Sequence, residues 1–274
     1  MNTLDRFLVK EKVCIITGAG GLLGEKHAEA ILEGGGIPIL LDLSQEKLQI
    51  KAAKLSEKYG VKVDYYESDI THENEISKVR DLIVERYGRI DVLINNAANN
   101  PKVEDGLNCY NRFESFDEEY WDADLNVGLK GSFLCTKIFG REMAKQMKGA
   151  ILNISSDLGL VGPDQRIYRK NGMKEEEQFT KPVTYSVVKH GLIGLTKYTA
   201  TYWAEKNVRA NAICPGGVYT GQDEEFVRIL SNLIPMGRMA NKEEYKAAIL
   251  FLISDASAYM TGSIITMDGG RTCW

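Results

Sequence analysis

The stretch VCIITGAGGLLG, residues 13–24, joins an apolar β-branched run to a glycine-rich turn. Such a run is typical of a strand that is buried on both faces of a sheet. An amphipathic pattern continues to about Glu33 and predicts a helix that ends at the glycines of residues 34–36. A second apolar run, residues 37–41, predicts a strand that leads directly into Asp42. Strand, glycine turn, helix, strand and acid, in this order, predict a βαβ unit that binds a dinucleotide.

The residue types of this unit indicate which dinucleotide it takes. Glycines let the backbone approach a pyrophosphate, and a helix N-terminus offers free N–H groups and a positive dipole. Asp42 follows Gly24 by 18 positions, where an acid accepts hydrogen bonds from the adenosine ribose. An acid there repels a 2′-phosphate, and no Arg follows Asp42 to bind one. The sequence therefore predicts NAD rather than NADP, against the alternative of a glycine turn that binds nothing.

Strand and helix patterns alternate through the rest of the chain. Further strands are expected at residues 61–66, 91–94, 150–154, 207–213 and 263–267. Further helices are expected at residues 44–58, 73–87, 117–147 with a bend near Gly128 or Gly131, 183–206, 222–233 and 241–253. This alternation predicts one α/β Rossmann domain over residues 1–274, with a doubly wound parallel sheet of about seven strands and helices on both faces. Ligands are then expected at the carboxyl ends of the strands.

Tyr185 and Lys189 lie four positions apart inside one predicted helix. Residues at this spacing share a helical face. A Tyr that acts as a base near neutral pH needs a pKa well below its ordinary value of about 10, and a neighbouring ammonium lowers it by favouring the phenolate. An isolated Y-x-x-x-K pattern more often marks a surface Tyr and Lys that are merely neighbours, so its weight comes from the rest of the chain.

The composition excludes several classes of protein. The 274 residues carry a net charge of −4, which argues against a dedicated nucleic-acid binder, and no apolar segment approaches the length of a membrane span. The N-terminus lacks the apolar run of a signal peptide, so a cytoplasmic protein with reduced thiols is expected. No metal site is expected, because neither the cysteines nor His27, His72 and His190 have ligand spacing. The cysteines are residues 14, 109, 135, 214 and 273.

Over essentially its whole length the chain resembles the short-chain dehydrogenase/reductase family, in its compact branch. The matching motifs are TGAGGLLG at 17–24, Asp42, Asp69, NNAA at 95–98, LNVGLKG at 125–131, ISSDLG at 154–159, Tyr185 with Lys189, CPGGVYT at 214–220 and TGSIITMDGG at 261–270. Their order and separation carry the resemblance, since each motif alone is weak.

The resemblance implies an enzyme that binds NAD and moves a hydride between nicotinamide and a secondary alcohol or ketone. Tyr185 is then the general acid/base, Lys189 lowers its pKa, Ser156 orients the substrate oxygen and Asn126 holds a relay water. Ser155 is the alternative catalytic serine; Ser156 is preferred because it keeps the S-x-x-G spacing to Gly159. The implied cofactor-binding residues are Gly18, Gly21, Leu23, Asp42, Asp69, Ile70, Asn96, Ala97, Tyr185, Lys189, Val218 and Thr220.

The chain departs from the family pattern in three places. The glycine turn has Leu22 where a Gly is usual, and NNAA replaces NNAG, which is tolerable if the backbone there is not left-handed. Ser156 and Tyr185 lie 29 positions apart, so residues 160–181 form an insertion beside the expected pocket. The insertion is either a lid whose Arg or Lys side chains clamp an anionic substrate group or a solvated polar loop.

The stretches at residues 216–226, 235–240 and 268–274 resemble a sub-branch of flagellin-modification, or surface-sugar, oxidoreductases. They suggest a substrate loop and helix at about 216–240 and a sugar or sugar derivative as substrate, with Gln222, Asp223, Arg238 and Asn99–Asn100 as polar partners. Rival interpretations are an NADPH-dependent 3-oxoacyl or general carbonyl reductase and a non-catalytic NAD-sensing protein. The family also implies a homodimer or homotetramer through the helices near 117–147 and 183–206.

Overall fold

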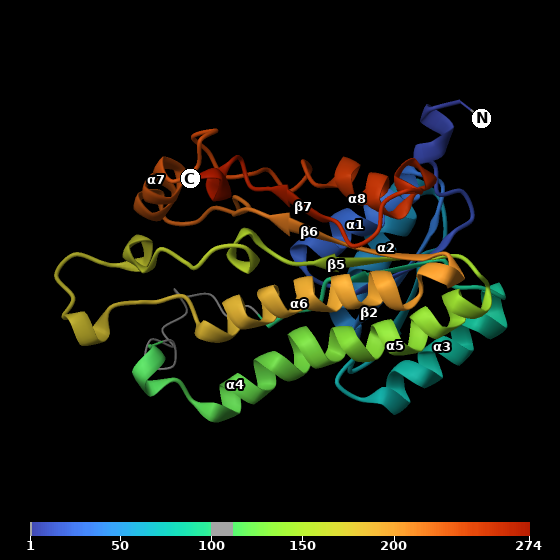
Figure 1. Ribbon diagram of the computed structural model, residues 1–274, viewed down its shortest axis with the longest axis horizontal. Helices are drawn as coiled ribbons and strands as arrows, with labels where there is room; N and C mark the ends of the chain where they lie inside the picture. Colours follow the sequence, from blue (N-terminus) through green and yellow to red (C-terminus); the bar gives the residue numbers. More distant parts are fainter. Residues whose placement is uncertain (1, 100–111) are drawn as a thin grey trace.

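A parallel sheet forms the centre of the molecule (Figure 1). The structure is a computed structural model and describes residues 2–99 and 112–274. Within them the sheet has seven strands in the order β3-β2-β1-β4-β5-β6-β7, and every neighbouring pair is parallel. The strands are β1 Val13–Thr17, β2 Ile37–Asp42, β3 Asp64–Glu67, β4 Val92–Asn95, β5 Gly149–Ile154, β6 Val208–Pro215 and β7 Ile264–Met267.

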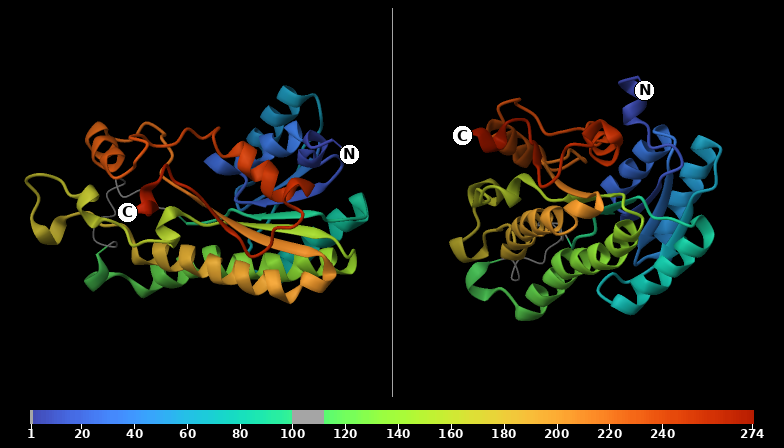
Figure 2. Two further views of the ribbon diagram at one scale, coloured as in Figure 1. Left: turned by 45° about the horizontal axis from the view of Figure 1, so that its top comes forward. Right: turned by 45° about the vertical axis from the view of Figure 1, so that its right-hand side comes forward.

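Helices cover both faces of this sheet (Figure 2). One face carries α1 Leu22–Glu33, α2 Gln45–Tyr59 and α8 Lys246–Ile253. The other carries α3 Glu73–Tyr87, α5 Ser132–Lys145 and α6 Val183–Tyr202, and α4 Glu118–Leu125 packs against α6. The remaining helix of eight residues or more in the described chain, α7 Glu224–Asn232, lies beyond the carboxyl ends of the strands. The single-domain, doubly wound Rossmann fold is confirmed.

The buried run of β1 serves both cores. Cys14 and Ile16 belong to the core under α1, α2 and α8, whereas Val13 and Ile15 belong to the core under α3, α5 and α6. Successive strand side chains point to opposite faces, so a strand covered on both faces needs apolar residues at every position. This requirement explains the uninterrupted apolar run from which the fold was predicted.

The long helix expected over residues 117–147 runs in three parts. α4 passes into a π-helical segment, Asn126–Gly131, and then into α5. Gly128 packs against α6, where a Cβ would lie 2.5 Å from the Val188 side chain, so a larger residue would push the two helices apart. The expected bend near the glycines therefore coincides with a π segment, a form that is often found at functional sites.

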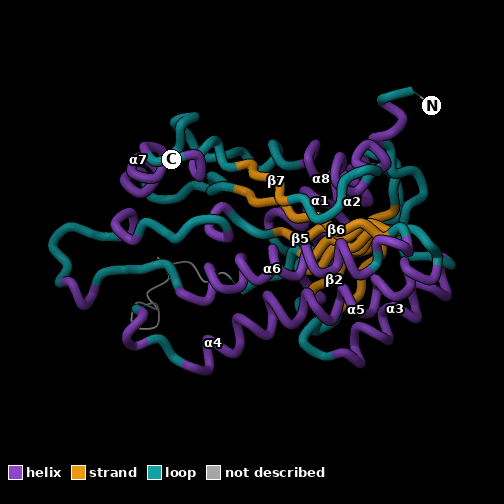
Figure 3. Tube along the Cα trace, in the orientation of Figure 1, coloured by secondary structure: helices purple, strands orange, loops and turns teal. Residues whose placement is uncertain are grey.

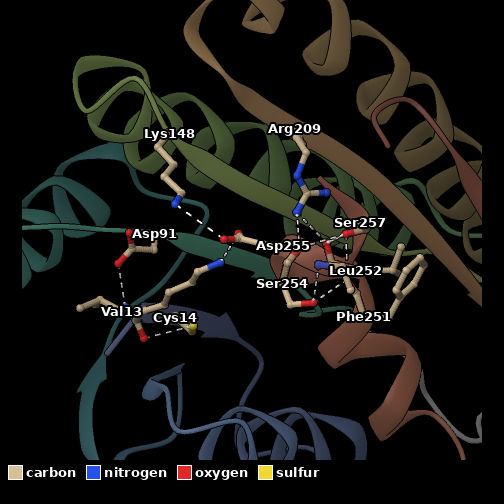
Figure 4. Close-up of polar contacts among 12 residues, drawn as sticks. Val13, Cys14, Asp91, Lys148, Arg209, Phe251, Leu252, Ser254, Asp255 and Ser257 are labelled. Carbon is tan, nitrogen blue, oxygen red and sulfur yellow. Dashed lines mark hydrogen bonds and ion pairs between the residues drawn. The ribbon is translucent and has the colours of Figure 1, made fainter. Parts of the chain in front are cut away.

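Polar contacts fasten the end of the sheet that lies opposite the carboxyl termini of the strands (Figure 4). Arg209, on β6, donates to the carbonyls of Leu252 and Ser254 at 3.2 and 3.1 Å. The Oδ1 of Asp255 forms an ion pair with the Nζ of Lys12 at 2.8 Å, and the Oδ2 of Asp91 accepts the Val13 N–H at 2.9 Å. These contacts join β1, β6 and the end of α8. They therefore hold together the end of the sheet that is remote from the carboxyl termini of the strands.

A buried acid on α1 leads to a first prediction, about stability. The side chain of Glu29 is 2% exposed and is paired with Lys26 at 2.8 Å and with Lys58 of α2 at 2.9 Å. Although its burial acts in the opposite direction, the two lysines lower the pKa of Glu29 to about 2. We expect Glu29→Gln to lower the free energy of unfolding by about 2 kcal/mol, because two charge-assisted hydrogen bonds are lost. Urea unfolding at neutral pH measures this change.

The ion pairs of Glu29 also predict how the stability of the protein depends on pH. The folded-state pKa lies below the unfolded value, so the stabilisation is complete above about pH 4.5 and is lost as the pH falls towards 2. The loss of stability over that range should be smaller in Glu29→Gln than in the wild type. Glu57→Gln, at an exposed position on α2, is the matched control. Equal acid sensitivity of wild type and Glu29→Gln would contradict the assignment.

The carboxyl ends of the strands meet three irregular segments. These are residues 160–181, the α7 region and the last residues of the chain, which gather at one end of the molecule (Figures 1 and 3). No helix within the described residues has both the length and the apolar character that crossing a membrane requires.

Candidate active site

A cavity of about 1400 Å³ opens at the carboxyl ends of the strands. It extends from the glycine turn after β1 to Tyr185 on α6, and residues of the insertion and of α7 line it. Pockets for one small ligand usually measure about 300–1,000 Å³. This cavity therefore has room for a large ligand and a second, smaller one.

The glycine turn approaches the end of β4 very closely. Gly18 has φ +63°, and a Cβ there would lie 2.7 Å from the Cα of Ala97, so only Gly fits. Asn96 braces the turn, because its Nδ2 donates to the carbonyls of Thr17 and Gly18, each at 3.0 Å. His27 contacts the Asn96 Oδ1 at 3.2 Å. The Asn96 side chain thus holds the turn in place. Its partner His27 is a buried packing residue, and burial lowers the pKa of that His to about 4.

Asp42 stands where the sequence places a ribose-binding acid. Its Oδ2 accepts the N–H of Gly20 at 2.9 Å, and its Oδ1 accepts the N–H of Ser44 at 3.1 Å. Helix α1 begins immediately after Gly21, so its free N–H groups face the same cavity. Close backbone approach, a helix N-terminus and an anchored acid together fit a dinucleotide. Lys47 also lines this part of the cavity, which the sequence analysis did not foresee.

The other predicted cofactor residues line the same cavity. These are Leu23, Asp69, Ile70, Ala97, Val218 and Thr220. Burial raises the pKa of Asp69, but hydrogen bonds from Thr71 and the neighbouring His72 outweigh it, so the net pKa is lowered. Gln222 holds the loop before α7 in place, since its Nε2 donates to the Val218 carbonyl and its Oε1 accepts the Thr220 N–H, each at 2.8 Å.

Ser156, Tyr185 and Lys189 converge at the other end of the cavity. Ser156 follows β5; its hydroxyl donates to the Asp157 Oδ1 at 2.7 Å and is near enough to Tyr185 to lower the pKa of the phenol. The Lys189 Nζ donates to the Ile154 carbonyl at 2.8 Å and lies 5.6 Å from the centre of the Tyr185 ring. A carbinol oxygen placed between Ser156 and Tyr185 would meet both hydroxyls, which is the arrangement that proton exchange needs.

Burial controls the protonation of this group. It raises the pKa of Tyr185; the Ser156 hydrogen bond opposes the rise and the Asp157 carboxylate adds to it. Burial also lowers the pKa of Lys189 to about 8, with a further contribution from the positive charge of Lys181. Lys181, at the end of the insertion, has its Nζ 3.9 Å from the centre of the Tyr185 ring. Two ammonium groups therefore flank the phenol, of which the sequence analysis identified one.

Ser155 and Ser156 differ in what their hydroxyls contact. The Ser155 hydroxyl donates to the backbone carbonyl of Lys189 at 2.7 Å and so ties β5 to α6. The Ser156 hydroxyl instead donates to the Asp157 carboxylate at 2.7 Å and acts on the pKa of Tyr185, with which Ser156 lines the cavity. This difference favours Ser156 as the serine that contacts the substrate. Ser155 has a structural role, because it links β5 to α6.

Asn126 begins the π-helical segment and is not among the residues that line the cavity. A separate space of about 10 Å³, close to the size of one water, lies beside Lys189 and is lined by Asp124, Gly128 and Thr184 among others. Thr184 donates to Asp124 across the α4–α6 contact at 2.5 Å. The relay role of Asn126 stays a prediction.

The insertion of residues 160–181 packs on α7 and forms one wall of the cavity. Ile167 is buried with Leu230, Ile234 and Met239, and the ring of Tyr168 lies 5.7 Å from that of Phe226. The Gln178 side chain fixes both the N–H and the carbonyl of Lys170, at 2.8 and 3.0 Å. The insertion is therefore a docked wall, and its outer side carries the exposed residues 174–177.

Two family models match the chain. One, described as short chain dehydrogenase, matches residues 12–168, and the other, described as enoyl-(acyl carrier protein) reductase, matches residues 171–272. The chain belongs to the short-chain dehydrogenase/reductase family. It is accordingly an oxidoreductase that acts on alcohols or ketones with a nicotinamide cofactor.

Relatives of this dehydrogenase differ in substrate. A 3-oxoacyl-[acyl-carrier-protein] reductase of Thermotoga maritima is 36% identical over 264 residues, 94% of this chain and 97% of the relative. An NAD-dependent glycerol dehydrogenase of Listeria innocua is 32% identical and covers 97% of this chain and 96% of its own. A gluconate 5-dehydrogenase from Burkholderia cenocepacia, solved with NADP and tartrate, has a TM-score of 0.86, 26% identity and full coverage of both chains.

The departures of this dehydrogenase from its family are accommodated. The last residue of the NNAA motif, Ala98, is not among the residues with positive φ, so no glycine is needed there. Arg238 pairs with Glu244 at 2.7 Å and does not line the cavity, so it was wrongly suggested as a substrate partner. Asn99 and Asp223 do line it, whereas Asn100 and Cys109 fall outside the described residues.

Several residues of the dehydrogenase site were missed in the sequence. Tyr168 lines the cavity, and its pKa is raised by burial and by its neighbours Tyr185 and Asp157, against the influence of Arg271. Both Asp157 and Arg271 also line the cavity, from opposite ends of the second half of the chain. For Asp157 and Arg271 the only sequence signal was their place in the motifs SSDLG and DGGRTCW.

Proposed function

We propose that the protein is an NAD-dependent oxidoreductase that interconverts a secondary alcohol and a ketone of a polar substrate, a sugar or sugar derivative. The observation that carries this proposal is that Tyr185, between Ser156 and Lys189, lines the same cavity as Asp42. In alcohol oxidation Tyr185 accepts the hydroxyl proton, Ser156 holds the substrate oxygen, and the positive charge of Lys189 opposes the rise that burial causes in the Tyr185 pKa. Bound nicotinamide supplies the hydride acceptor.

The preference for NAD rests on the charge of Asp42. We expect Asp42→Asn to change the ratio of NADH to NADPH affinity by about 10-fold or more in favour of NADPH, because the repulsion of a 2′-phosphate is removed. Asn keeps the size of Asp but only one acceptor oxygen, so it retains the contact with either Gly20 or Ser44 and loses the other, an effect that both cofactors share. Titration of each cofactor by nicotinamide fluorescence measures the two dissociation constants.

Lys47 is the group in this part of the cavity that would favour a 2′-phosphate. Lys47→Ala should weaken NADPH binding and leave NADH binding nearly unchanged. Glu46→Gln, at a neighbouring exposed position, is the control for a general change in surface charge. Tighter binding of NADPH than of NADH by the wild type would overturn the cofactor assignment.

The main rival is an NADPH-dependent 3-oxoacyl or general carbonyl reductase, which the Thermotoga relative supports. Against it stand Asp42 and the polar groups that line the substrate side, Asp157, Tyr168, Asp223 and Arg271. A screen of polyols, sugars, sugar phosphates and 3-oxoacyl thioesters with both cofactors, read by nicotinamide absorbance, compares the two functions. Turnover confined to the thioesters would exclude the sugar assignment.

We further propose a cytoplasmic homodimer or homotetramer that acts in the modification of surface sugars. Its assembly is supported by large exposed side chains on the two long helices, namely Tyr120, Phe133, Val187, Tyr198 and Tyr202. Tyr198 and Tyr202 stack at 5.7 Å between ring centres, which presents a flat aromatic surface. Light scattering of the purified protein gives the number of subunits.

A further inference from the structure

A buried ion pair stands beside the catalytic serine. The Nη1 of Arg271 lies 2.5 Å from the Oδ2 of Asp157, and the two side chains are 10% and 5% exposed. Both residues line the cavity. Nothing in the chemistry described so far, proton exchange by Tyr185 or binding of a dinucleotide, uses this pair.

The pair is joined directly to Ser156. The Ser156 hydroxyl donates to the Oδ1 of Asp157 at 2.7 Å, and the Leu158 N–H donates to the same oxygen at 2.8 Å. The carboxylate therefore lies one hydrogen-bond length from the hydroxyl that is expected to meet the reacting oxygen. The two oxygens of a vicinal diol are separated by a similar distance, about 2.8 Å, the usual length of an O–H···O hydrogen bond.

The end of the chain is built to hold Arg271 in place. The Asp268 carboxylate accepts the N–H groups of Gly270 and Thr272 and the hydroxyl of Thr272, at 2.8, 2.8 and 2.7 Å. Gly269 and Gly270 have φ of +67° and +91°, which turns the chain back towards β5. A guanidinium that is so fixed loses little entropy when it binds a ligand.

Arg271 has hydrogen-bond donors to spare. A guanidinium carries five N–H groups, and within residues 2–99 and 112–274 that of Arg271 makes one side-chain hydrogen bond, the one to Asp157. The other donors belong to a side chain that lines the cavity. A ligand there can accept from Arg271 and donate to Asp157 at the same time.

We propose that Asp157 and Arg271 bind the hydroxyl on the carbon next to the reacting carbinol, which makes the enzyme selective for vicinal diols and α-hydroxyketones of polyols and sugars. A hydroxyl both donates and accepts, as this acid–base pair requires. The charges of the two side chains cancel, and Asp157 repels an anion, so the pair suits a neutral hydroxyl better than a carboxylate or phosphate. This inference rests on the proposed function and narrows its substrate class.

A matched pair of alcohols tests the proposal. With NAD, the wild type should oxidise a vicinal cyclohexanediol with a kcat/KM about 100-fold above that of cyclohexanol, because a charge-assisted hydrogen bond contributes about 1.5–3 kcal/mol. The double variant Asp157→Asn/Arg271→Met removes both charges together and so leaves no buried charge unpaired. In that variant the ratio of the two kcat/KM values should fall to within a few-fold of one.

Arg166→Met is the control within the insertion, because that side chain is 80% exposed and pairs with Asp164 outside the cavity. Arg166→Met should keep the wild-type ratio of the two kcat/KM values. The single variant Arg271→Lys should keep part of that ratio, because Lys retains the positive charge. A wild-type ratio near one, or an unchanged ratio in the double variant, overturns the proposal. A preference for sugar acids or sugar phosphates that the double variant loses also overturns it, in favour of anion recognition.

A second measurement separates this inference from the proposed function. Calorimetric titration of the diol and of cyclohexanol into the NADH-bound protein needs no turnover. Absence of oxidation of every alcohol with either nicotinamide would refute the proposed function. Tighter binding of the diol by the wild type, lost in the double variant, would still support recognition by Asp157 and Arg271, and equal binding of the two alcohols would refute it.

Discussion

Replacement of Tyr185 by Phe is expected to lower kcat for alcohol oxidation by about 10³-fold, within the range for loss of a positioned acid/base. Tyr185 and Ser156 line the same cavity, and Phe removes the phenol oxygen while it keeps the ring between Lys181 and Lys189. NADH binding should change by less than a few-fold. Steady-state kinetics and a fluorescence titration of NADH measure the two quantities.

Tyr259→Phe is the control for this variant, because Tyr259 has an exposed ring and does not line the cavity. Its kinetics should equal those of the wild type. Retention of more than about a tenth of kcat by Tyr185→Phe would exclude the phenol as the group that exchanges the proton, since general acid–base catalysis contributes at least about 10²-fold.

The sequence predicted those parts of the fold that depend on local pattern. Val13–Thr17 and Glu73–Tyr87 have the expected bounds, because an apolar run and an amphipathic period each define one element. The third strand begins at Asp64 instead of residue 61, since β2 first pairs with it at Ile39, opposite Asp64. Val61 consequently remains exposed, and no local pattern could show where pairing begins.

The residues of the candidate site divide in the same way, into those that local motifs reveal and those that only the fold brings together. Ser156, Tyr185 and Lys189 belong to motifs, so their roles could be proposed from the sequence, and the fold brings them together. Arg271 reaches Asp157 from 114 positions away, and only the turn at the C-terminus reveals the contact. Asn96 illustrates a third case: it lines the cavity, where the motif predicts a ligand contact, and its side chain also braces the glycine turn, which the motif did not reveal.

Replacement of Lys189 by Met should lower kcat by about 10²-fold and move the ascending limb of the pH–rate profile to higher pH. Tyr185 must be unprotonated to accept the substrate proton, so the rate rises with pH up to the apparent pKa of the phenol. Burial already raises that pKa, and loss of the neighbouring ammonium raises it further. The activity of Lys189→Met should therefore recover in part at alkaline pH.

The pH profile separates this role from a structural one. Lys189 also anchors α6 to the Ile154 carbonyl, so a purely structural effect would lower kcat equally at all pH values and leave the limb in place. Lys197→Met, at an exposed position on the same helix, should match the wild type. Lys181→Met should move the limb in the same direction, because its ammonium lies closer to the ring than that of Lys189. If the ascending limb moved in Lys181→Met and stayed in place in Lys189→Met, control of the phenol pKa would belong to Lys181 of the insertion.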